Sequence, residues 1–152
     1  MQRLKNLILV LLLASAPLLT AADELVDLSP AQLQKIRKND ALVIDIRTEQ
    51  EWQSTGIIPG SRMLQFFDAQ GQADPRQWLE QMQKLRRSPE QPIVLVCRSG
   101  NRSRMAGDFL TRQAGMKNIY HLQNGLKSWL QQGKATEPVC IGQIACNQAA
   151  TE

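Results

Sequence analysis

Short apolar runs alternate along this chain with segments whose apolar positions recur at helical spacing. The runs typical of buried strands cover residues 41–46, 63–66, 92–96 and 118–122. The helical segments are expected to begin at residues 30, 49, 75, 104 and 125. This alternation predicts an α/β domain in which an open, mainly parallel sheet is flanked by helices on both faces.

Helix-capping residues place several of these boundaries. Thr48 is followed three positions later by Glu51, a pattern in which each side chain caps the backbone N–H of the other residue. Ser103 is expected to cap the helix that closes at Gly115. The capping residues therefore support a helix after each of two predicted strands.

The first 22 residues have the pattern of a secretory signal peptide. Arg3 and Lys5 precede an apolar core over Leu7–Leu13, and cleavage is expected after Ala22. An uncleaved membrane anchor is the alternative, but Pro17 interrupts the uncharged stretch, which is also shorter than the roughly 20 residues of a spanning helix. We therefore expect an exported protein of the bacterial periplasm, without a stable membrane anchor.

The chain beyond this leader has the length of one domain. We expect the domain over residues 23–136 and a C-terminal tail over residues 137–152. Loss of the leader lowers the formal charge from +4 to +2, because Arg3 and Lys5 leave with it and no acidic residue does. The sequence has no basic run with interleaved aromatic residues, so a nucleic-acid partner is not expected. The oligomeric state stays open.

The three cysteines divide into a tail pair and a single thiol. Cys140 and Cys146 lie close together in the tail, and an oxidising compartment favours a disulfide between them. Closing so short a loop would contribute about 2 kcal/mol of stability. Cys97 would then be the free thiol. A second arrangement stays open, in which a tail cysteine reaches Cys97 as a resolving partner.

The segment with the most chemical content is Cys97-Arg98-Ser99-Gly100-Asn101-Arg102-Ser103. An apolar run precedes it and a helical pattern follows, so the thiol is expected where a strand ends and a loop leads into a helix. Free N–H groups and the positive end of the helix dipole stabilise a thiolate there. Core packing also explains a cysteine at a strand end, but it does not call for Arg98 and Arg102. The pattern therefore indicates a nucleophile or an anion site.

A second polar segment is expected near this thiol. Ligands of open parallel sheets bind beyond the carboxyl ends of the strands. Cys97 and Asp45 both follow or end predicted strands, so the segment Asp45-Ile46-Arg47 is expected at the same rim of the sheet as the thiol loop.

Four segments in order resemble the single-domain rhodaneses, a family of sulfurtransferases, over about residues 27–133. They are Asp45-Ile46-Arg47 with Glu51-Trp52, Gly56-Ile57-Ile58-Pro59-Gly60-Ser61, the loop from Cys97 to Ser103, and Leu122-Gln123-Asn124-Gly125 with Trp129. Three positions depart from the family: Ile57 replaces a histidine, Asn124 replaces a glycine, and Ser99 stands where some thiosulfate-using members have lysine. The missing lysine removes a cation for the sulfonate of thiosulfate, for which Arg98 and Arg102 could compensate.

The resemblance implies a rhodanese-like fold and a cofactor-free enzyme that moves sulfane sulfur through a persulfide on Cys97. The donor would be a small anion such as thiosulfate and the acceptor a thiophile such as cyanide or a thiol. Loop N–H groups would stabilise the anion, and the two arginines would hold the donor. Asp45 and Arg47 would brace the loop, or form an ordinary ion pair at the strand end. The residues expected to bind substrate are Arg98, Ser99, Gly100, Asn101, Arg102 and Ser103.

Other functions share parts of this pattern. The loop of cysteine phosphatases and arsenate reductases resembles Cys, five residues and Arg, but Ser103 stands at that sixth position, and Val96 stands where those phosphatases favour histidine. A non-catalytic sulfur carrier or binding module is another alternative. Thiol–disulfide exchange would need the tail cysteines as resolving thiols, because the sequence has no Cys-x-x-Cys motif.

His121 is the only histidine of the chain. It falls at the end of the last predicted strand, and we interpret it as a packed or surface residue rather than as a partner of Cys97. One histidine and two paired cysteines provide no credible ligand set, so no metal site is expected.

Overall fold

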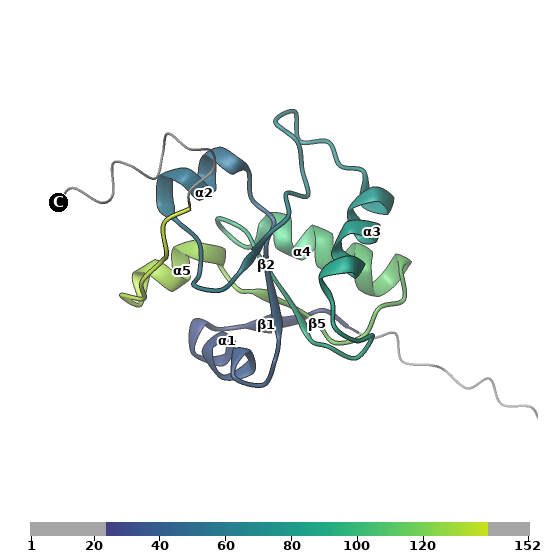
Figure 1. The fold of residues 1–152 in the computed structure, drawn as a ribbon, viewed down its shortest axis with the longest axis horizontal. Coiled ribbons are helices and arrows are strands. Elements are labelled where there is room, and N and C mark those ends of the chain that lie inside the picture. The colour runs from purple at the N-terminus through teal and green to yellow at the C-terminus, as the bar shows by residue number, and fades with distance from the viewer. Residues whose placement is uncertain (1–23, 140–152) are drawn as a thin grey trace, which may run out of the picture.

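A single five-stranded sheet organises the described part of the chain, which is residues 24–139 of a computed structural model (Figure 1). Neighbouring strands are all parallel, in the order β1-β5-β4-β2-β3. The strands are β1 (Val26–Leu28), β2 (Leu42–Asp45), β3 (Arg62–Met63), β4 (Ile93–Val96) and β5 (Ile119–Leu122). The α-helices are α1 (Pro30–Arg37), α2 (Glu49–Thr55), α3 (Pro75–Leu85), α4 (Asn101–Asp108) and α5 (Gly125–Gln131), and a π-helical turn, η1 (Phe109–Gln113), follows α4. The predicted α/β class is confirmed.

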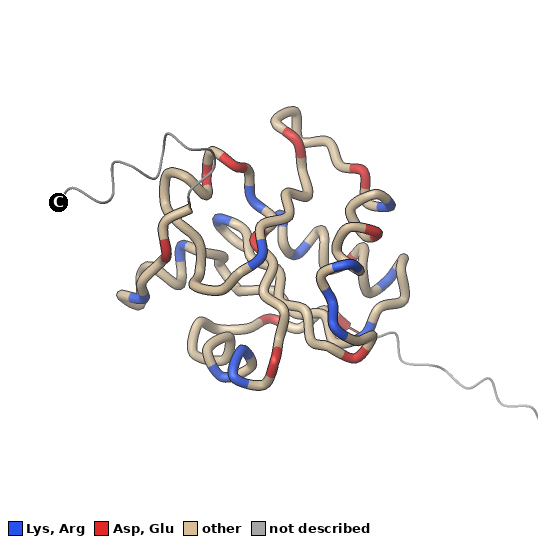
Figure 2. The backbone as a smooth tube through the Cα atoms, viewed as in Figure 1, with Lys and Arg blue, Asp and Glu red and all other residues tan. Residues whose placement is uncertain are grey.

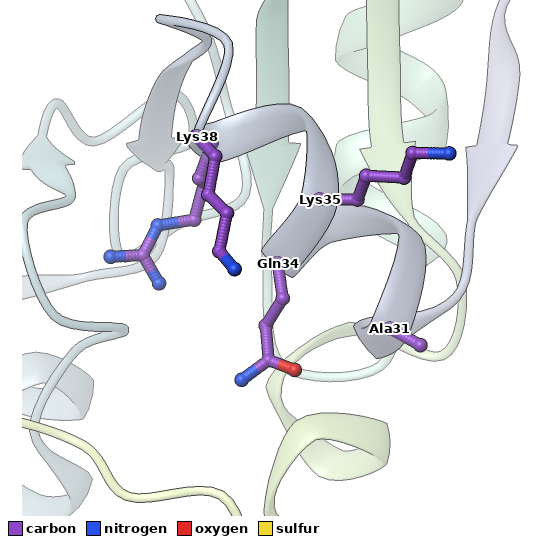
Figure 3. A pocket seen from close by; sticks show the side chains of 5 residues that line it. Ala31, Gln34, Lys35 and Lys38 are labelled. Atoms are coloured by element: carbon purple, nitrogen blue, oxygen red, sulfur yellow. The ribbon is translucent and has the colours of Figure 1, made fainter.

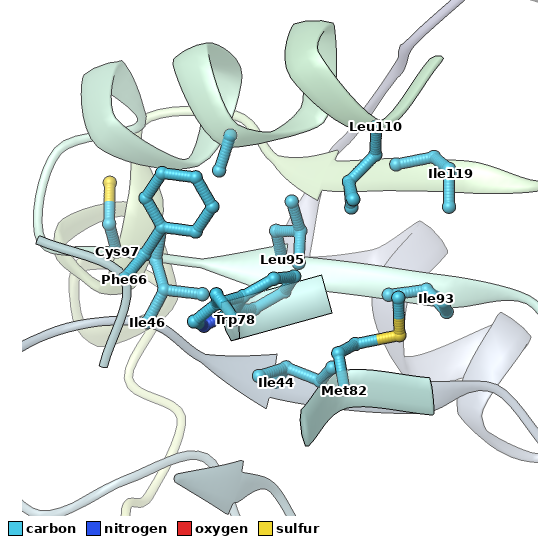
Figure 4. Packing of buried hydrophobic residues seen from close by; sticks show 11 residues of the cluster. Ile44, Ile46, Phe66, Trp78, Met82, Ile93, Leu95, Cys97, Leu110 and Ile119 are labelled. Atoms are coloured by element: carbon cyan, nitrogen blue, oxygen red, sulfur yellow. The ribbon is translucent and has the colours of Figure 1, made fainter. Parts of the chain in front are cut away.

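Helices cover both faces of the sheet, as predicted. On one face, Trp78 of α3 and Leu110 of η1 belong to a cluster that includes inward side chains of β2, β4 and β5 (Figure 4). On the other face, Leu33 of α1 and Trp129 of α5 pack with the alternate residues of the same strands. All four residues of β4 are buried. This burial on both sides explains why the strand appears in the sequence as a continuous apolar run.

The predicted cap of α2 is present. The N–H of Glu51 donates to Thr48 Oγ1 at 3.3 Å, and the N–H of Thr48 donates to Glu51 Oε2 at 3.1 Å. The helix therefore begins where the sequence places it, directly after β2.

The predicted cap of α4 is wrong. The helix begins at Asn101, and its N-cap is Gly100, which has a φ of 93°. Ser103 lies inside the first turn, where its hydroxyl is 3.1 Å from the carbonyl oxygen of Gly100. Glycine adopts this left-handed conformation without steric cost, so the chain turns into the helix three residues earlier than a serine cap would allow. Before Gly115, the α-helix gives way to the π-turn η1.

The two edge strands differ from expectation. The sequence pattern does not predict β1, because Val26 and Asp27 are exposed and only Leu28 is buried. The strand expected over residues 63–66 is β3, which covers only Arg62 and Met63. The chain nevertheless continues beside β2 after β3 ends. Backbone N–H groups of the next segment donate to carbonyl oxygens at the end of β2 and directly after it.

The C-terminal end of the described chain packs against the turn after α2 and against α5. Ile57 and Glu137 exchange backbone hydrogen bonds of 2.9 and 2.8 Å. The Trp129 indole donates to the carbonyl oxygen of Ala135 at 2.9 Å. These contacts place the start of the predicted tail against the domain.

Several expectations concern residues outside the described range. The signal peptide, Cys140 and Cys146 all lie there, so the cleavage site, the disulfide and the domain boundaries stay predictions. Within residues 24–139, no helix is long and apolar enough to cross a membrane. Figure 2 shows basic and acidic positions interspersed along the described chain, without a long segment of one sign.

Candidate active site

The thiol of Cys97 lies in a loop that joins β4 to α4. The residue is 0% exposed. Its Sγ accepts hydrogen bonds from the N–H of Gly100 at 3.1 Å and the N–H of Ser103 at 3.4 Å, and the Ser103 hydroxyl is also 3.4 Å away. Figure 4 shows Cys97 at one end of the buried cluster, beyond Leu95 of β4. The loop therefore directs several donors at one sulfur atom, an arrangement that favours an anion there.

The start of α5 holds this loop from outside. The N–H of Leu126 donates to the carbonyl oxygen of Cys97 at 2.7 Å, and the N–H of Lys127 donates to that of Arg98 at 3.1 Å. Gly125 has a φ of 58°, and a Cβ there would lie 2.3 Å from the Cys97 carbonyl oxygen. Glycine is therefore required where the two backbones meet. The Gly100 position is similar, because a Cβ there would lie 3.0 Å from the backbone nitrogen of Asn124.

Arg102 is held by Glu51, a carboxylate that the sequence marks as a helix cap and as part of the family motif but not as a partner of the thiol loop. Its guanidinium makes two contacts with Glu51, of 2.6 and 2.9 Å. Burial raises the pKa of Glu51, but the hydrogen bonds from Arg102 and Thr48 outweigh it and lower this pKa to about 2. The same ion pair raises the pKa of Arg102. Glu51 is thus a site residue, and the loop is tied to α2.

Asp45 and Arg47 form a buried ion pair beneath α2. Their N···O distance is 2.7 Å, and each side chain is 1% exposed. Arg47 also donates to Thr55 Oγ1 and to the carbonyl oxygen of Gly56, both at 2.7 Å. The pair therefore fixes the end of α2 and the turn after it. Its support of the thiol loop runs through α2, which carries Glu51 to the loop.

A cleft of about 780 Å³ borders the loop. Arg98 and Ser99 are exposed there, directly after the buried thiol. Lys127 and Leu130 line the cleft from α5. Its described lining residues are Arg47, Glu51, Ser54, Thr55, Arg98, Ser99, Leu126, Lys127, Leu130 and Gln131. The cleft thus combines cationic and apolar groups beside the thiol loop.

A second hollow, of about 600 Å³, lies over α1 and is separate from this site. Its described lining residues are Ala31, Gln34, Lys35, Arg37 and Lys38 (Figure 3). All belong to α1 or the turn after it, and none comes from the thiol loop. We therefore place the candidate active site at the cleft beside Cys97.

Two further residues approach the thiol through Ser103. His121 Nδ1 is 3.2 Å from the Ser103 hydroxyl, and His121 Nε2 is 2.7 Å from Asp27. His121 is buried, as the packed-residue interpretation expects, but one hydroxyl group separates it from Cys97. Sequence reasoning missed Asp27 altogether, because it lies in the strand that the hydrophobic pattern does not reveal. In the described range, no three histidine, cysteine or carboxylate side chains are grouped to hold a metal ion.

Comparison with known families matches this chain to one of them. The family model of the rhodanese-like domain matches residues 29–132. The chain belongs to this family. A thiosulfate sulfurtransferase, GlpE, from Ectopseudomonas mendocina (strain ymp) is 32% identical to this rhodanese-like domain in an alignment of 105 residues that covers 67% of this chain and 82% of the relative. Membership and such relatives support a sulfurtransferase at the level of the family.

Solved structures share the fold of this rhodanese-like domain. A polysulfide-sulfur transferase homodimer from Wolinella succinogenes has a TM-score of 0.58 and 24% identity, over 78% of this chain and 82% of that one. A protein of unknown function from Rhodopseudomonas palustris, described as a possible tyrosine phosphatase, has a TM-score of 0.55 and 26% identity, over 74% of this chain and 85% of that one. At 24% identity, the comparison with the Wolinella succinogenes protein supports the fold alone.

Proposed function

We propose that this protein transfers sulfane sulfur through a persulfide on Cys97, from an anionic donor such as thiosulfate to a thiophilic acceptor such as cyanide or a thiol. The observation that carries the proposal is the pair of N–H groups, from Gly100 and Ser103, that point at one sulfur where a loop enters a helix. Such groups stabilise a thiolate before the reaction and a persulfide anion after the first step.

The proposed reaction has two half-reactions, both at the Cys97 sulfur. The thiolate attacks the outer sulfur of thiosulfate, the S–S bond of the donor breaks, and sulfite leaves with the bonding electron pair. The acceptor then attacks the outer sulfur of the persulfide, and the Cys97 thiolate leaves. With cyanide the product is thiocyanate. Electrons balance in each step, so the chemistry needs no cofactor.

The donor would approach through the cleft. Arg98 is exposed at its rim, and Lys127 lines it from α5. These two cations suit the negative sulfonate of thiosulfate. They supply the positive charge that is missing at Ser99, where some thiosulfate-using members of the family have lysine. Arg102 contributes less to donor binding than the resemblance implies, because Glu51 already holds both of its terminal nitrogens.

Mass spectrometry after treatment with thiosulfate tests the proposal. We expect the mass of one sulfur atom on the peptide that contains Cys97, and thiocyanate release when cyanide follows. Cys97→Ser should lose both signals and keep its fold, whereas a variant that replaces Cys140 and Cys146 by serine should keep both. Persulfide formation without repeated turnover would indicate a sulfur carrier. Absence of the added sulfur with thiosulfate, polysulfide and cysteine persulfide donors would refute the proposal.

Phosphatase chemistry is the second candidate, because the possible tyrosine phosphatase from Rhodopseudomonas palustris shares this fold at 26% identity. The loop of such phosphatases resembles Cys, five residues and Arg, and here Ser103 stands at the position of that arginine. The neighbouring Arg102 is paired with Glu51. Both facts count against this candidate. Incubation with an aryl phosphate separates the two functions. Phosphate release without thiocyanate formation would favour the phosphatase.

Export is the remaining part of the proposal. The signal-peptide pattern of the first 22 residues supports secretion into a bacterial periplasm, with cleavage after Ala22. N-terminal sequencing of the protein from a periplasmic fraction tests it, and the expected first residue is Asp23. The full leader on the recovered chain would contradict the proposed cleavage.

A further inference from the structure

A chain of hydrogen-bonding groups connects the buried thiol to the protein surface. Cys97 Sγ is 3.4 Å from Ser103 Oγ, which is 3.2 Å from His121 Nδ1. His121 Nε2 is 2.7 Å from Asp27 Oδ1. The side chain of His121 is 2% exposed, whereas that of Asp27 is 37% exposed. The chain therefore runs from a sulfur without solvent contact to a carboxylate that water reaches.

The parallel sheet brings these groups together. Asp27 of β1 is the register partner of His121 of β5, so the two side chains are neighbours on one face. His121 is also the register partner of Leu95 of β4, and Cys97 lies two residues beyond Leu95. The first turn of α4 places Ser103 between the thiol and the imidazole.

The charge on Asp27 fixes the direction of these hydrogen bonds. Burial raises the pKa of Asp27, but hydrogen bonds from Arg104, at 2.8 and 2.9 Å, and from His121 outweigh it and hold this pKa below its ordinary value. The carboxylate is therefore ionised at neutral pH and only accepts hydrogen bonds, so His121 Nε2 carries a hydrogen. Burial lowers the pKa of His121, despite Asp27. The neutral ring thus has an unprotonated Nδ1, an acceptor 3.2 Å from the Ser103 hydroxyl, whose one hydrogen can point there or to the Gly100 carbonyl oxygen at 3.1 Å.

This direction leaves Ser103 Oγ free to accept a hydrogen bond from the Cys97 thiol. When the Ser103 hydrogen points to His121 and not to the Gly100 carbonyl oxygen, each group donates toward Asp27: the thiol to Ser103, Ser103 to His121, and His121 to the carboxylate. The opposite direction would place an unprotonated Nε2 against a carboxylate oxygen at 2.7 Å, where two acceptors repel each other.

We propose that Ser103, His121 and Asp27 form a proton relay that ionises Cys97, with His121 and Asp27 as positioning residues that act through Ser103. The inference rests on the proposed sulfur transfer for its purpose. The S–H bond breaks as the Ser103 oxygen takes that proton, and the original hydroxyl proton passes to His121 Nδ1. The products are a thiolate and an imidazolium, and no electron is transferred. When the Cys97 thiolate leaves its persulfide in the second half-reaction, the imidazolium returns the proton along the same path.

Burial of the thiol gives this relay its role. Cys97 is 0% exposed, so bulk water does not take its proton directly. The loop N–H groups stabilise the thiolate but accept no proton. Asp27 favours the imidazolium by its charge and selects the ring tautomer that can receive a proton. A carboxylate has the same orienting role toward histidine in the serine-protease triad.

Other charges act on the two ionising groups. From α4, Arg104 disfavours the imidazolium and Asp108 favours it. Arg102, from the first turn of the same helix, interacts electrostatically with Cys97, with Asp45 and with its partner Glu51. The test therefore changes the relay residues and leaves these neighbours in place.

The pH dependence of Cys97 alkylation by iodoacetamide tests the relay. Alkylation of the reduced full-length protein is followed on the peptide that contains Cys97, so Cys140 and Cys146 do not contribute. In His121→Gln we expect the pH of half-maximal rate to rise by about one unit, because the cation that pairs with the thiolate is absent. Asp27→Asn should raise it by a smaller amount. Asp27→Glu should restore the wild-type midpoint, and Asp108→Asn is the control, with a shift smaller than that of Asp27→Asn.

Thermal melting establishes that each variant is folded before its titration is compared. If His121→Gln does not fold, Asp27→Asn decides alone, because its carboxylate lies at the surface. Unchanged midpoints in folded variants would overturn the relay, even where the wild type transfers sulfur. Alkylation needs neither donor nor acceptor, so a wild type that forms no persulfide would contradict the proposed function and leave the titration result standing.

Discussion

The thiol loop has two flanks that are held by different kinds of interaction. On the α2 side, ion pairs connect Arg102 to Glu51 and Arg47 to Asp45. On the β5 side, hydrogen bonds lead from the sulfur through Ser103 to His121. The ion pairs orient α2 and the loop, whereas the hydrogen bonds reach the sulfur itself.

This difference separates the shape of the loop from the state of its thiol. Changes on the α2 side should affect the free energy of unfolding and should leave the thiol titration close to that of the wild type. Changes at His121 or Asp27 should move the titration. The predictions below test this separation, from the largest expected effect to the smallest.

Removal of the buried arginine should have the largest effect. Arg47→Met leaves the Asp45 carboxylate buried without its partner and also removes contacts to Thr55 and Gly56. We expect a loss of about 4 kcal/mol in the free energy of unfolding, measured by urea denaturation. Arg87→Met is the control, because Arg87 pairs with Asp40 at the surface, where the two side chains are 70% and 57% exposed. An equal loss in both variants would contradict the proposed role of the buried pair.

A side chain at Gly125 should disturb the point at which α5 holds the loop. Gly125→Ala places a Cβ 2.3 Å from the carbonyl oxygen of Cys97, at a φ of 58°. We expect a loss of about 3 kcal/mol in unfolding free energy, together with reduced sulfur transfer. Gly115→Ala separates backbone strain from the clash, because its φ is 62° and nothing lies within 4 Å. Its loss should be about 1 kcal/mol, and an equal loss at Gly125 would show that the contact with the loop is unimportant.

Neutralising Glu51 should have an intermediate effect. Glu51→Gln removes the charge that holds Arg102, in a pair whose side chains are 24% and 30% exposed. We expect a loss of about 2 kcal/mol in unfolding free energy, between the values for exposed and buried pairs. The midpoint of Cys97 alkylation should move less than in His121→Gln. A larger shift would show that the α2 flank also controls the thiol.

The contribution of Glu51 should depend on pH. Its pKa falls from 4.5 to about 2 on folding, so the ionised form is stabilised in the folded protein. That stability is fully present above pH 4.5 and is lost as the pH falls toward 2. The difference in melting temperature between wild type and Glu51→Gln should therefore shrink over this range. If this difference in melting temperature stays constant from about pH 6 to about pH 2, ionisation of Glu51 is not its source.

The smallest effect on stability is expected at the rim of the cleft. Arg98 is exposed, so Arg98→Ala should change the unfolding free energy by less than about 0.5 kcal/mol. The KM for thiosulfate should rise about fivefold, the equivalent of one exposed ionic contact. Arg76→Ala, an exposed change on α3, should leave KM unchanged. Equal KM values for Arg98→Ala and the wild type would remove Arg98 from donor binding.

Sequence patterns were reliable where the local chain carries the physical cause. The central strand β4 is buried on both faces, so its apolar run predicted it directly. The capping residues Thr48 and Glu51 placed the start of α2 because their hydrogen bonds join positions three residues apart. The start of α4 was placed three residues too late, because its cap is the left-handed Gly100, which lies close to the backbone of Asn124, a residue distant in the sequence.

The sequence by itself determined the α/β class, the position of Cys97 between a strand and a helix, and the resemblance that led to the family. Those features depend on local periodicity and on residues within one short loop. Only the tertiary structure decided that Arg102 pairs with Glu51 and that His121 joins Ser103 to Asp27. Asp27 and His121 are 94 positions apart in the chain, and parallel pairing of β1 with β5 makes them neighbours. Contacts of this kind leave no periodic signal in a sequence, because the sheet order that creates them is a property of the whole fold.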